Sequence, residues 1–250
     1  MFANLQLKIE TDNKDFLRYE KATILQSVLM EHVNKEYAAM LHESGLHPYS
    51  QCIIASNKEN IWNVCTVNEE AYNNIIEPLC DDKFKDFYIE YDDFNVKILD
   101  KKLDVISKKE FMDKYYFEDS DRVIKLQFRT PSAFKRQGRY VFMPELELIY
   151  QSLMNKYDAA SEDEELDSEE LLDELVGHSN IIQYNLQSRY YSVGGVRIPS
   201  FTGEMTIKIN GPQQMANFVN MLCRFGEYSG IGIKTAMGMG SIRIIERGKA

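Results

Sequence analysis

Apolar and polar residues alternate in several segments of the first half of the chain, the pattern of half-buried β-strands. These segments are 5–10, 50–56, 61–67, 84–91 and 94–107. Between them, apolar residues recur at helical spacing over 18–41, which predicts one or two helices, and over 68–78, with Asn68 as a candidate helix cap. The pattern predicts strand, helix, strand, strand, helix and then further strands, and strand, helix, strand, strand, helix, strand is the split βαβ order of a ferredoxin-like fold.

The second half repeats this order without a repeated sequence. Its alternating segments are 123–134, 183–193, 204–209 and 239–245, and its segments of helical spacing are 145–156 and 211–228. We therefore predict an α+β protein made of two tandem ferredoxin-like (RRM-like) folds, with residues 1–120 in the first domain and 121–250 in the second.

The net charge of −10 hides an uneven distribution of charge along the chain. Residues 1–121 hold 14 basic and 24 acidic side chains, and residues 122–250 hold 15 of each. Ten of the acidic residues in the second half lie between Asp158 and Glu174, so the rest of that half has 15 basic and five acidic side chains. Because local fields steer a polyanion, the second half is the candidate for binding nucleic acid.

The acidic segment at about 158–176 is predicted to be an insertion in the second domain. A solvated, partly helical or disordered loop accounts for its composition. The alternative is a functional role, as a mimic of nucleic acid or a docking site for a basic partner.

Several classes of protein are excluded by composition. No apolar run reaches the ~20 residues of a membrane helix, and residues 1–15 lack the features of a secretory signal. The four cysteines contain no CxxC pair, which argues against a disulfide framework or a zinc site. They are Cys52, Cys65, Cys80 and Cys223. A cytoplasmic protein without membrane contact is expected.

Residues 226–245 carry the strongest local signal, five glycines between a predicted helix and the last predicted strand: Gly226, Gly230, Gly232, Gly238 and Gly240. Glycine lets backbone amides approach a phosphate closely, and Lys234 and Arg243 add positive charge. A P-loop is excluded because Ile233 precedes Lys234, and a dinucleotide fingerprint is excluded because Thr235 stands at its third glycine position. The alternative is a glycine-rich turn without a ligand.

The segment GIGIKTAMGMGSI, residues 230–242, resembles the signature loop of the RAMP superfamily of CRISPR proteins. Residues 130–153 and 194–209 resemble the second half of the repeat-processing endoribonuclease of that superfamily, and LHESGLHPYSQ, residues 41–51, resembles its catalytic histidine segment. The resemblance implies binding of CRISPR repeat RNA, membership of a CRISPR effector complex, and a monomer or homodimer. It also implies RNA contacts by the loop residues Gly230, Gly232, Lys234, Gly238 and Gly240.

Histidines supply the candidate catalytic groups. His42 and His47 are five residues apart with Gly45 between them, which does not fit the HExxH zinc motif. By resemblance, His42 is a general acid or base for attack of a ribose 2′-OH on the adjacent phosphate, giving a 2′,3′-cyclic phosphate and a 5′-OH without a metal or cofactor. Some family members add a tyrosine, where this chain has Met30, and a lysine, which is absent from 46–51. His32 and His47 are the candidates for the second group.

Basic residues gather between 122 and 139, interleaved with aromatic residues. From this segment we predict RNA contacts by Arg129, Lys135, Arg136 and Arg139. The alternation in KLQFRT also predicts that Lys125 and Arg129 share one face of a strand. The alternative is a solvated strand face above core aromatics.

Two other functions remain open from the sequence. A RAMP subunit that binds CRISPR guide RNA without cutting it would keep the glycine-rich loop but not a working histidine site. An unrelated ferredoxin-like interaction module would use the loop only as a turn.

Overall fold

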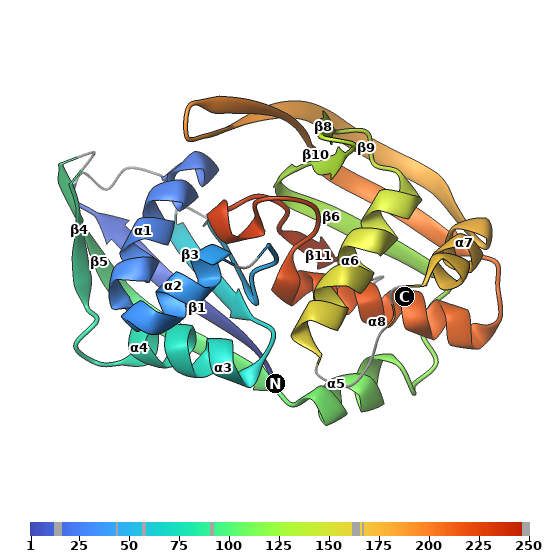
Figure 1. Ribbon diagram of the computed structural model, residues 1–250, viewed down its shortest axis with the longest axis horizontal. Helices are drawn as coiled ribbons and strands as arrows, with labels where there is room; N and C mark the ends of the chain where they lie inside the picture. The colour runs from blue at the N-terminus through green and yellow to red at the C-terminus, as the bar shows by residue number, and fades with distance from the viewer. Residues whose placement is uncertain are drawn as a thin grey trace.

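The first half folds into a five-stranded antiparallel sheet with helices on one face (Figure 1). The structure is a computed structural model that describes residues 1–12, 17–43, 45–56, 59–90, 93–161, 166 and 168–246. The strand order is β2-β3-β1-β5-β4. Its strands are β1 (Phe2–Thr11), β2 (Tyr49–Ser56), β3 (Glu59–Thr66), β4 (Asp86–Ile89) and β5 (Phe94–Ile106). The order β2-β3-β1-β5 is that of a ferredoxin-like fold, and β4 extends its edge.

The helices of this half follow the pattern of buried positions. They are α1 (Ala22–His32), α2 (Lys35–Glu43), α3 (Glu69–Ala71) and α4 (Glu77–Cys80), with a π-helical turn (Tyr72–Ile76) between the last two. The segment 18–41 forms two helices because the chain becomes extended at Val33. Asn34 precedes α2, and its side-chain oxygen accepts a hydrogen bond from the Glu36 amide at 2.8 Å. On β1, Leu5 and Leu7 are buried beneath these helices, while Gln6 faces the opposite side of the sheet.

The second half repeats the architecture with strand order β11-β6-β10-β9. Its strands are β6 (Val123–Ser132), β9 (Ser179–Val193), β10 (Val196–Ile209) and β11 (Ile242–Ile244), and its helices are α6 (Leu146–Ala160), α7 (Glu169–Gly177) and α8 (Gln213–Ser229). A small hairpin, β7 (Phe134–Arg136) with β8 (Arg139–Val141), is added after β6. The prediction of tandem ferredoxin-like folds is therefore confirmed.

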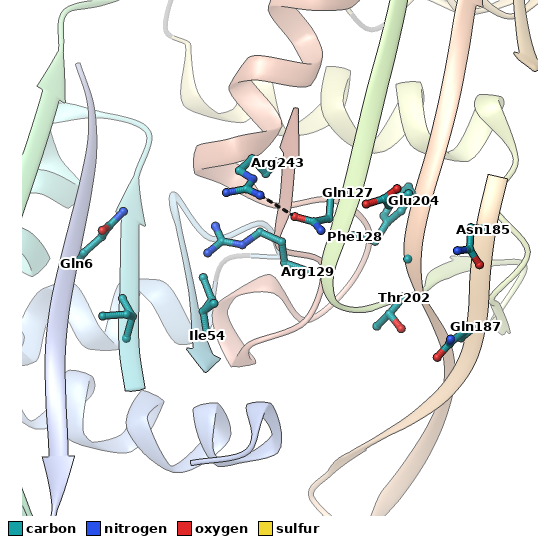
Figure 2. A pocket seen from close by; sticks show the side chains of 12 residues that line it. Gln6, Ile54, Gln127, Phe128, Arg129, Asn185, Gln187, Thr202, Glu204 and Arg243 are labelled. Carbon is teal, nitrogen blue, oxygen red and sulfur yellow. Dashed lines mark hydrogen bonds between the residues drawn. The ribbon is translucent and has the colours of Figure 1, made fainter. Parts of the chain in front are cut away.

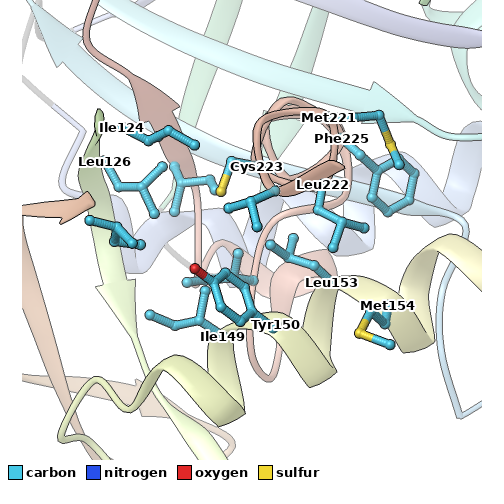
Figure 3. Close-up of a cluster of buried hydrophobic side chains, with 14 of the residues drawn as sticks. Ile124, Leu126, Ile149, Tyr150, Leu153, Met154, Met221, Leu222, Cys223 and Phe225 are labelled. Carbon is cyan, nitrogen blue, oxygen red and sulfur yellow. The ribbon is translucent and has the colours of Figure 1, made fainter. Parts of the chain in front are cut away.

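The core of the second half lies where α6 and α8 cross the sheet (Figure 3). Leu153 of α6 and Leu222 of α8 are both fully buried there, and the Tyr150 hydroxyl is satisfied by the Ser179 hydroxyl at 2.9 Å. Phe111 of α5 (Lys108–Tyr115) joins the same core, although it precedes the predicted domain boundary near residue 120. A helix from before the predicted boundary therefore packs in the core of the second half.

The hairpin of β9 and β10 is longer than the alternation predicted and connects the two halves. The predicted strands 183–193 and 204–209 extend to Ser179–Val193 and Val196–Ile209, joined by Gly194 and Gly195, both at positive φ. The hairpin arches over the top of the molecule in Figure 1. Near its tip the Tyr191 ring stacks on that of Tyr19, with centroids 5.9 Å apart, so the second half packs against the entrance to α1.

The acidic segment contains a helix that is anchored in the core. Leu172 and Leu175 of α7 are buried, while Glu169, Glu170 and Asp173 point into solvent. Residues 162–165 and 167 lie outside the described part of the chain. Among the described residues, no helix is both long and apolar enough to cross a membrane.

We predict that α7 contributes to stability through its leucines rather than its acids. Leu175→Ala should lower the free energy of unfolding by about 2–4 kcal/mol, because it leaves a cavity in the core. Glu170→Gln, the matched change on the exposed face, should leave it within about 0.5 kcal/mol of the wild type. Urea denaturation measures both. Equal small effects would mean that α7 is not packed as described.

Candidate active site

A pocket of about 360 Å³ opens where α1, α2, the start of β2 and the glycine-rich loop meet. We define the glycine-rich loop as residues 229–241. The pocket is lined by Gln26, Ser27, Met30, Leu41, His42, His47, Tyr49 and Met237. Met237 belongs to a short 3-10 helix of the loop, η3 (Thr235–Met237), so both halves of the protein contribute to this pocket.

His42 stands at the rim of the pocket because of its position on α2. Tyr37 and Leu41 face the core of the first half, which leaves His42, in the last turn of the helix, exposed to solvent. An imidazole there can exchange protons with a bound substrate. Of the sequence-predicted catalytic residues, His42 and His47 are brought to one pocket.

His47 is half-buried beside Tyr49, with 5.6 Å between the ring centroids. Burial lowers the pKa of His47, and the neighbouring positive charges of His42, Lys234 and Lys156 lower it further. Its Nδ1 atom is buried and has no hydrogen-bond partner in the described part of the chain. The site therefore favours a neutral imidazole with one nitrogen uncommitted.

His32, the third histidine candidate, lies elsewhere. Its Nδ1 is 2.8 Å from the carbonyl oxygen of Val28, and its ring makes an edge contact with Phe84 at 4.7 Å between centroids. It does not line the pocket of His42. Met30 does line it, so at this position α1 offers a thioether and no ionisable group.

The glycines of the loop permit close packing against the protein itself. A Cβ on Gly232 would lie 2.1 Å from the carbonyl oxygen of Ala133, and one on Gly240 would lie 2.0 Å from that of Ile231. Gly230, Gly238 and Gly240 are buried, whereas Gly232 is half-exposed and Lys234 is exposed. Of the five loop residues predicted to contact RNA, Gly232 and Lys234 thus reach the surface.

Several amides of the loop already have partners within the chain. Ile231 donates to the Gly240 carbonyl at 2.8 Å, Ile233 to the Ala133 carbonyl at 3.0 Å, and Gly232 to the Ser152 hydroxyl at 2.7 Å. These amides hold the loop rather than a phosphate. Lys234, in the left-handed region at φ 59°, is the exposed cation that the loop presents.

A second feature, a polar cleft of about 650 Å³, separates the open faces of the two sheets (Figure 2). Arg129 extends into it from β6, on the same face as Lys125 and Gln127, as the alternation predicted. Burial lowers the pKa of Arg129. Four amide side chains that the sequence did not single out also line the cleft: Gln6, Gln127, Asn185 and Gln187. The sequence signal that could have identified them is the polar residues at alternate positions of β1, β6 and β9.

The other predicted basic residues lie on the β7–β8 hairpin, next to the glycine-rich loop. Lys135 and Arg139 are exposed, while Arg136 is held by Glu145, with its Nη2 atom 2.8 Å from both carboxylate oxygens. The hairpin follows Ala133, whose carbonyl contacts the loop. The predicted set is therefore divided between the cleft, with Arg129, and this hairpin.

Comparison with known proteins identifies relatives along the whole chain. The family model described as CRISPR-associated endoribonuclease Cas6 matches residues 126–242. A protein of that name from Mycobacterium tuberculosis is 33% identical over 246 residues, covering 97% of this chain and 78% of its own. One from Streptococcus thermophilus is 33% identical over 220 residues, covering 88% and 89%.

Solved structures share the fold at lower identity. A Cas6 product complex superposes with a TM-score of 0.80 at 18% identity, covering 98% of this chain and all of the other. Thermus thermophilus Cas6 superposes with a TM-score of 0.70 at 19% identity, covering 98% of each chain.

We predict that Gly240 is required for packing and not merely for its positive φ. Gly240→Ala should lower the free energy of unfolding by about 2–4 kcal/mol, since it combines an unfavourable φ with a clash against backbone. Gly195→Ala is the matched control, because Gly195 also has positive φ (78°) but nothing lies within 4 Å of its added Cβ. It should cost about 1 kcal/mol. Equal losses in urea denaturation would contradict the packing role.

Proposed function

The chain belongs to the family of CRISPR-associated endoribonucleases called Cas6, and from this membership we propose that it cuts CRISPR precursor transcripts within their repeats, without a metal ion, to make guide RNAs. The observation that carries the proposal is the convergence of His42, His47 and Lys234 at the junction of the two halves. Two imidazoles and an ammonium suffice for acid–base cleavage of a phosphodiester.

The proposed reaction is an internal transfer of the phosphoryl group. A base takes the proton of a ribose 2′-OH, the 2′ oxygen attacks the adjacent phosphorus, and the bond to the 5′ oxygen of the next nucleotide breaks. That oxygen leaves with a proton from a general acid. The products are a 2′,3′-cyclic phosphate and a 5′-OH.

The environments of the histidines support distinct roles. Because burial and nearby cations lower the pKa of His47, its neutral form is populated near pH 7 and can accept the 2′-OH proton. His42 is exposed at the rim, where it can reach the leaving oxygen and act as the general acid. Lys234 offers a positive charge that holds the phosphate beside the two histidines.

RNA binding would extend from this pocket over the second half. Lys135 and Arg139 on the β7–β8 hairpin are exposed cations beside the glycine-rich loop, and Arg129 and Arg243 lie in the cleft between the sheets. Cations hold phosphates, and the amides of the cleft can hydrogen-bond base edges. The partner we propose is single-stranded or hairpin repeat RNA.

His42 and Lys234 should separate catalysis from binding. His42→Ala should lower the single-turnover cleavage rate of a labelled repeat RNA by roughly 10²-fold or more and leave affinity nearly unchanged, because it removes a proton donor. Lys234→Ala should weaken affinity and reduce the salt dependence of binding by about one ion, because it removes a phosphate contact.

The control is His178→Ala, since His178 is exposed at the end of α7 and does not line the pocket. It should leave rate and affinity unchanged. Wild-type cleavage by His42→Ala would show that His42 does not transfer a proton. Binding without any cleavage by the wild-type protein would instead favour the alternative, a subunit that binds CRISPR guide RNA without cutting it.

A further inference from the structure

Lys156 is a buried lysine that neither the pocket nor the cleft uses. It lies on α6 with 7% of its surface exposed. Its ammonium donates to three oxygens: the carbonyls of Ser229 and Gly230, at 3.3 and 3.1 Å, and the Thr235 hydroxyl, at 3.3 Å. No carboxylate in the described part of the chain pairs with it. Its three N–H donors are thus matched entirely by neutral oxygens of the glycine-rich loop.

These contacts join two separate parts of the loop. The carbonyls of Ser229 and Gly230 lie at the C-terminal end of α8, where carbonyls lack partners within the helix and a positive charge is favoured. Thr235 begins η3, immediately after Lys234. Lys156 therefore caps α8 and at the same time ties it to the segment that carries the exposed cation.

Ser152 supports the loop from the same face of α6. Residues 152 and 156 are four apart, so their side chains lie one above the other on the helix. The Ser152 hydroxyl accepts a hydrogen bond from the Gly232 amide, two residues before Lys234. On the other side of the loop, the Gln51 side chain of β2 donates to the carbonyl oxygen of Ala236 at 3.0 Å. The loop is held from both halves.

We propose that Lys156 is a positioning residue, whose three hydrogen bonds hold the glycine-rich loop in the conformation that presents Lys234 beside His42 and His47. This inference rests on the proposed function, since it concerns how that site is set up. Lys156 touches no substrate. Lys156 affects the position of Lys234 through its hydrogen bonds to the Ser229 and Gly230 carbonyls and to the Thr235 hydroxyl.

The charge of Lys156 also reaches the site. The groups that lower the pKa of His47 after burial are His42, Lys234 and Lys156. Burial lowers the pKa of Lys156 itself to about 7, so below that pH it is mostly charged in the folded protein. Removing this charge must raise the pKa of His47. If His47 is the base, the acidic limb of the rate profile then moves to higher pH.

The test compares the wild type with Lys156→Met, which keeps the length of the side chain and removes its charge and donors. Met fills the same space but leaves the three acceptors of Lys156 without their donor, so the variant should fold with a lower urea midpoint than the wild type. Affinity for labelled repeat RNA should fall roughly tenfold, because the loop loses the charged hydrogen bonds that keep Lys234 in its binding position. The acidic limb of the single-turnover rate should move to higher pH.

Two further variants keep the test decisive. Lys109→Met makes the same charge change on the exposed face of α5 and should leave affinity and pH profile unchanged. Thr235→Val replaces Lys156→Met in the test if Lys156→Met fails to fold. It removes one acceptor of Lys156 with little change of shape, so it should lower RNA affinity by a smaller factor. Wild-type affinity and pH profile in folded Lys156→Met, or wild-type affinity in Thr235→Val when that variant is needed, would overturn the proposal. Absence of cleavage by the wild type would instead refute the proposed function.

Discussion

The whole arrangement depends on backbone packed directly against backbone at the glycine-rich loop. Any side chain at Gly232 or Gly240 would occupy the place of a carbonyl oxygen of this chain. Because glycine has no side chain, the loop can pass between the two halves with its backbone in contact with neighbouring carbonyls. Contacts from Ser152 and Lys156 on one side and from Gln51 on the other then fix it. The pocket of His42 exists only where these halves meet.

Local charge, rather than the total of −10, decides what this junction can bind. Burial lowers the pKa of His47, and the positive charges of His42, Lys234 and Lys156 lower it further, so His47 is neutral more readily than in water. The exposed acidic residues of the second half include those of α7, a helix that does not line the pocket and that is anchored to the core by its leucines. A polyanion can therefore meet a positive site on a negatively charged protein.

Much of the fold could be predicted from alternation and helical spacing, because each strand such as β1 buries one face and exposes the other. The extension of the β9–β10 hairpin could not, since Pro199 and Gly203 interrupt the alternation while pairing continues through both. The packing of α5 with the second core was also missed, because it depends on contacts far apart in the sequence.

For the site, the resemblance placed His42 and His47 in one segment, and the fold brings both to one pocket. The packing role of the glycines could not be predicted from the sequence, because the contact of Gly232 with Ala133 joins residues about a hundred positions apart. Lys156 was missed for a related reason. A lysine in an amphipathic helix is typical of a solvated position, and its acceptors belong to a different part of the chain.

The central claim is that the RNA supplies its own nucleophile at a site made by this chain alone. The most direct measurement is single-turnover cleavage, in excess EDTA, of a repeat RNA that carries one 2′-deoxy nucleotide at the mapped cleavage position, beside the all-ribose RNA. We predict that the all-ribose RNA is cut, leaving a 2′,3′-cyclic phosphate, and that the deoxy RNA binds equally well and stays intact. Cleavage of the deoxy RNA, or loss of all cleavage in EDTA while binding persists, would contradict this account.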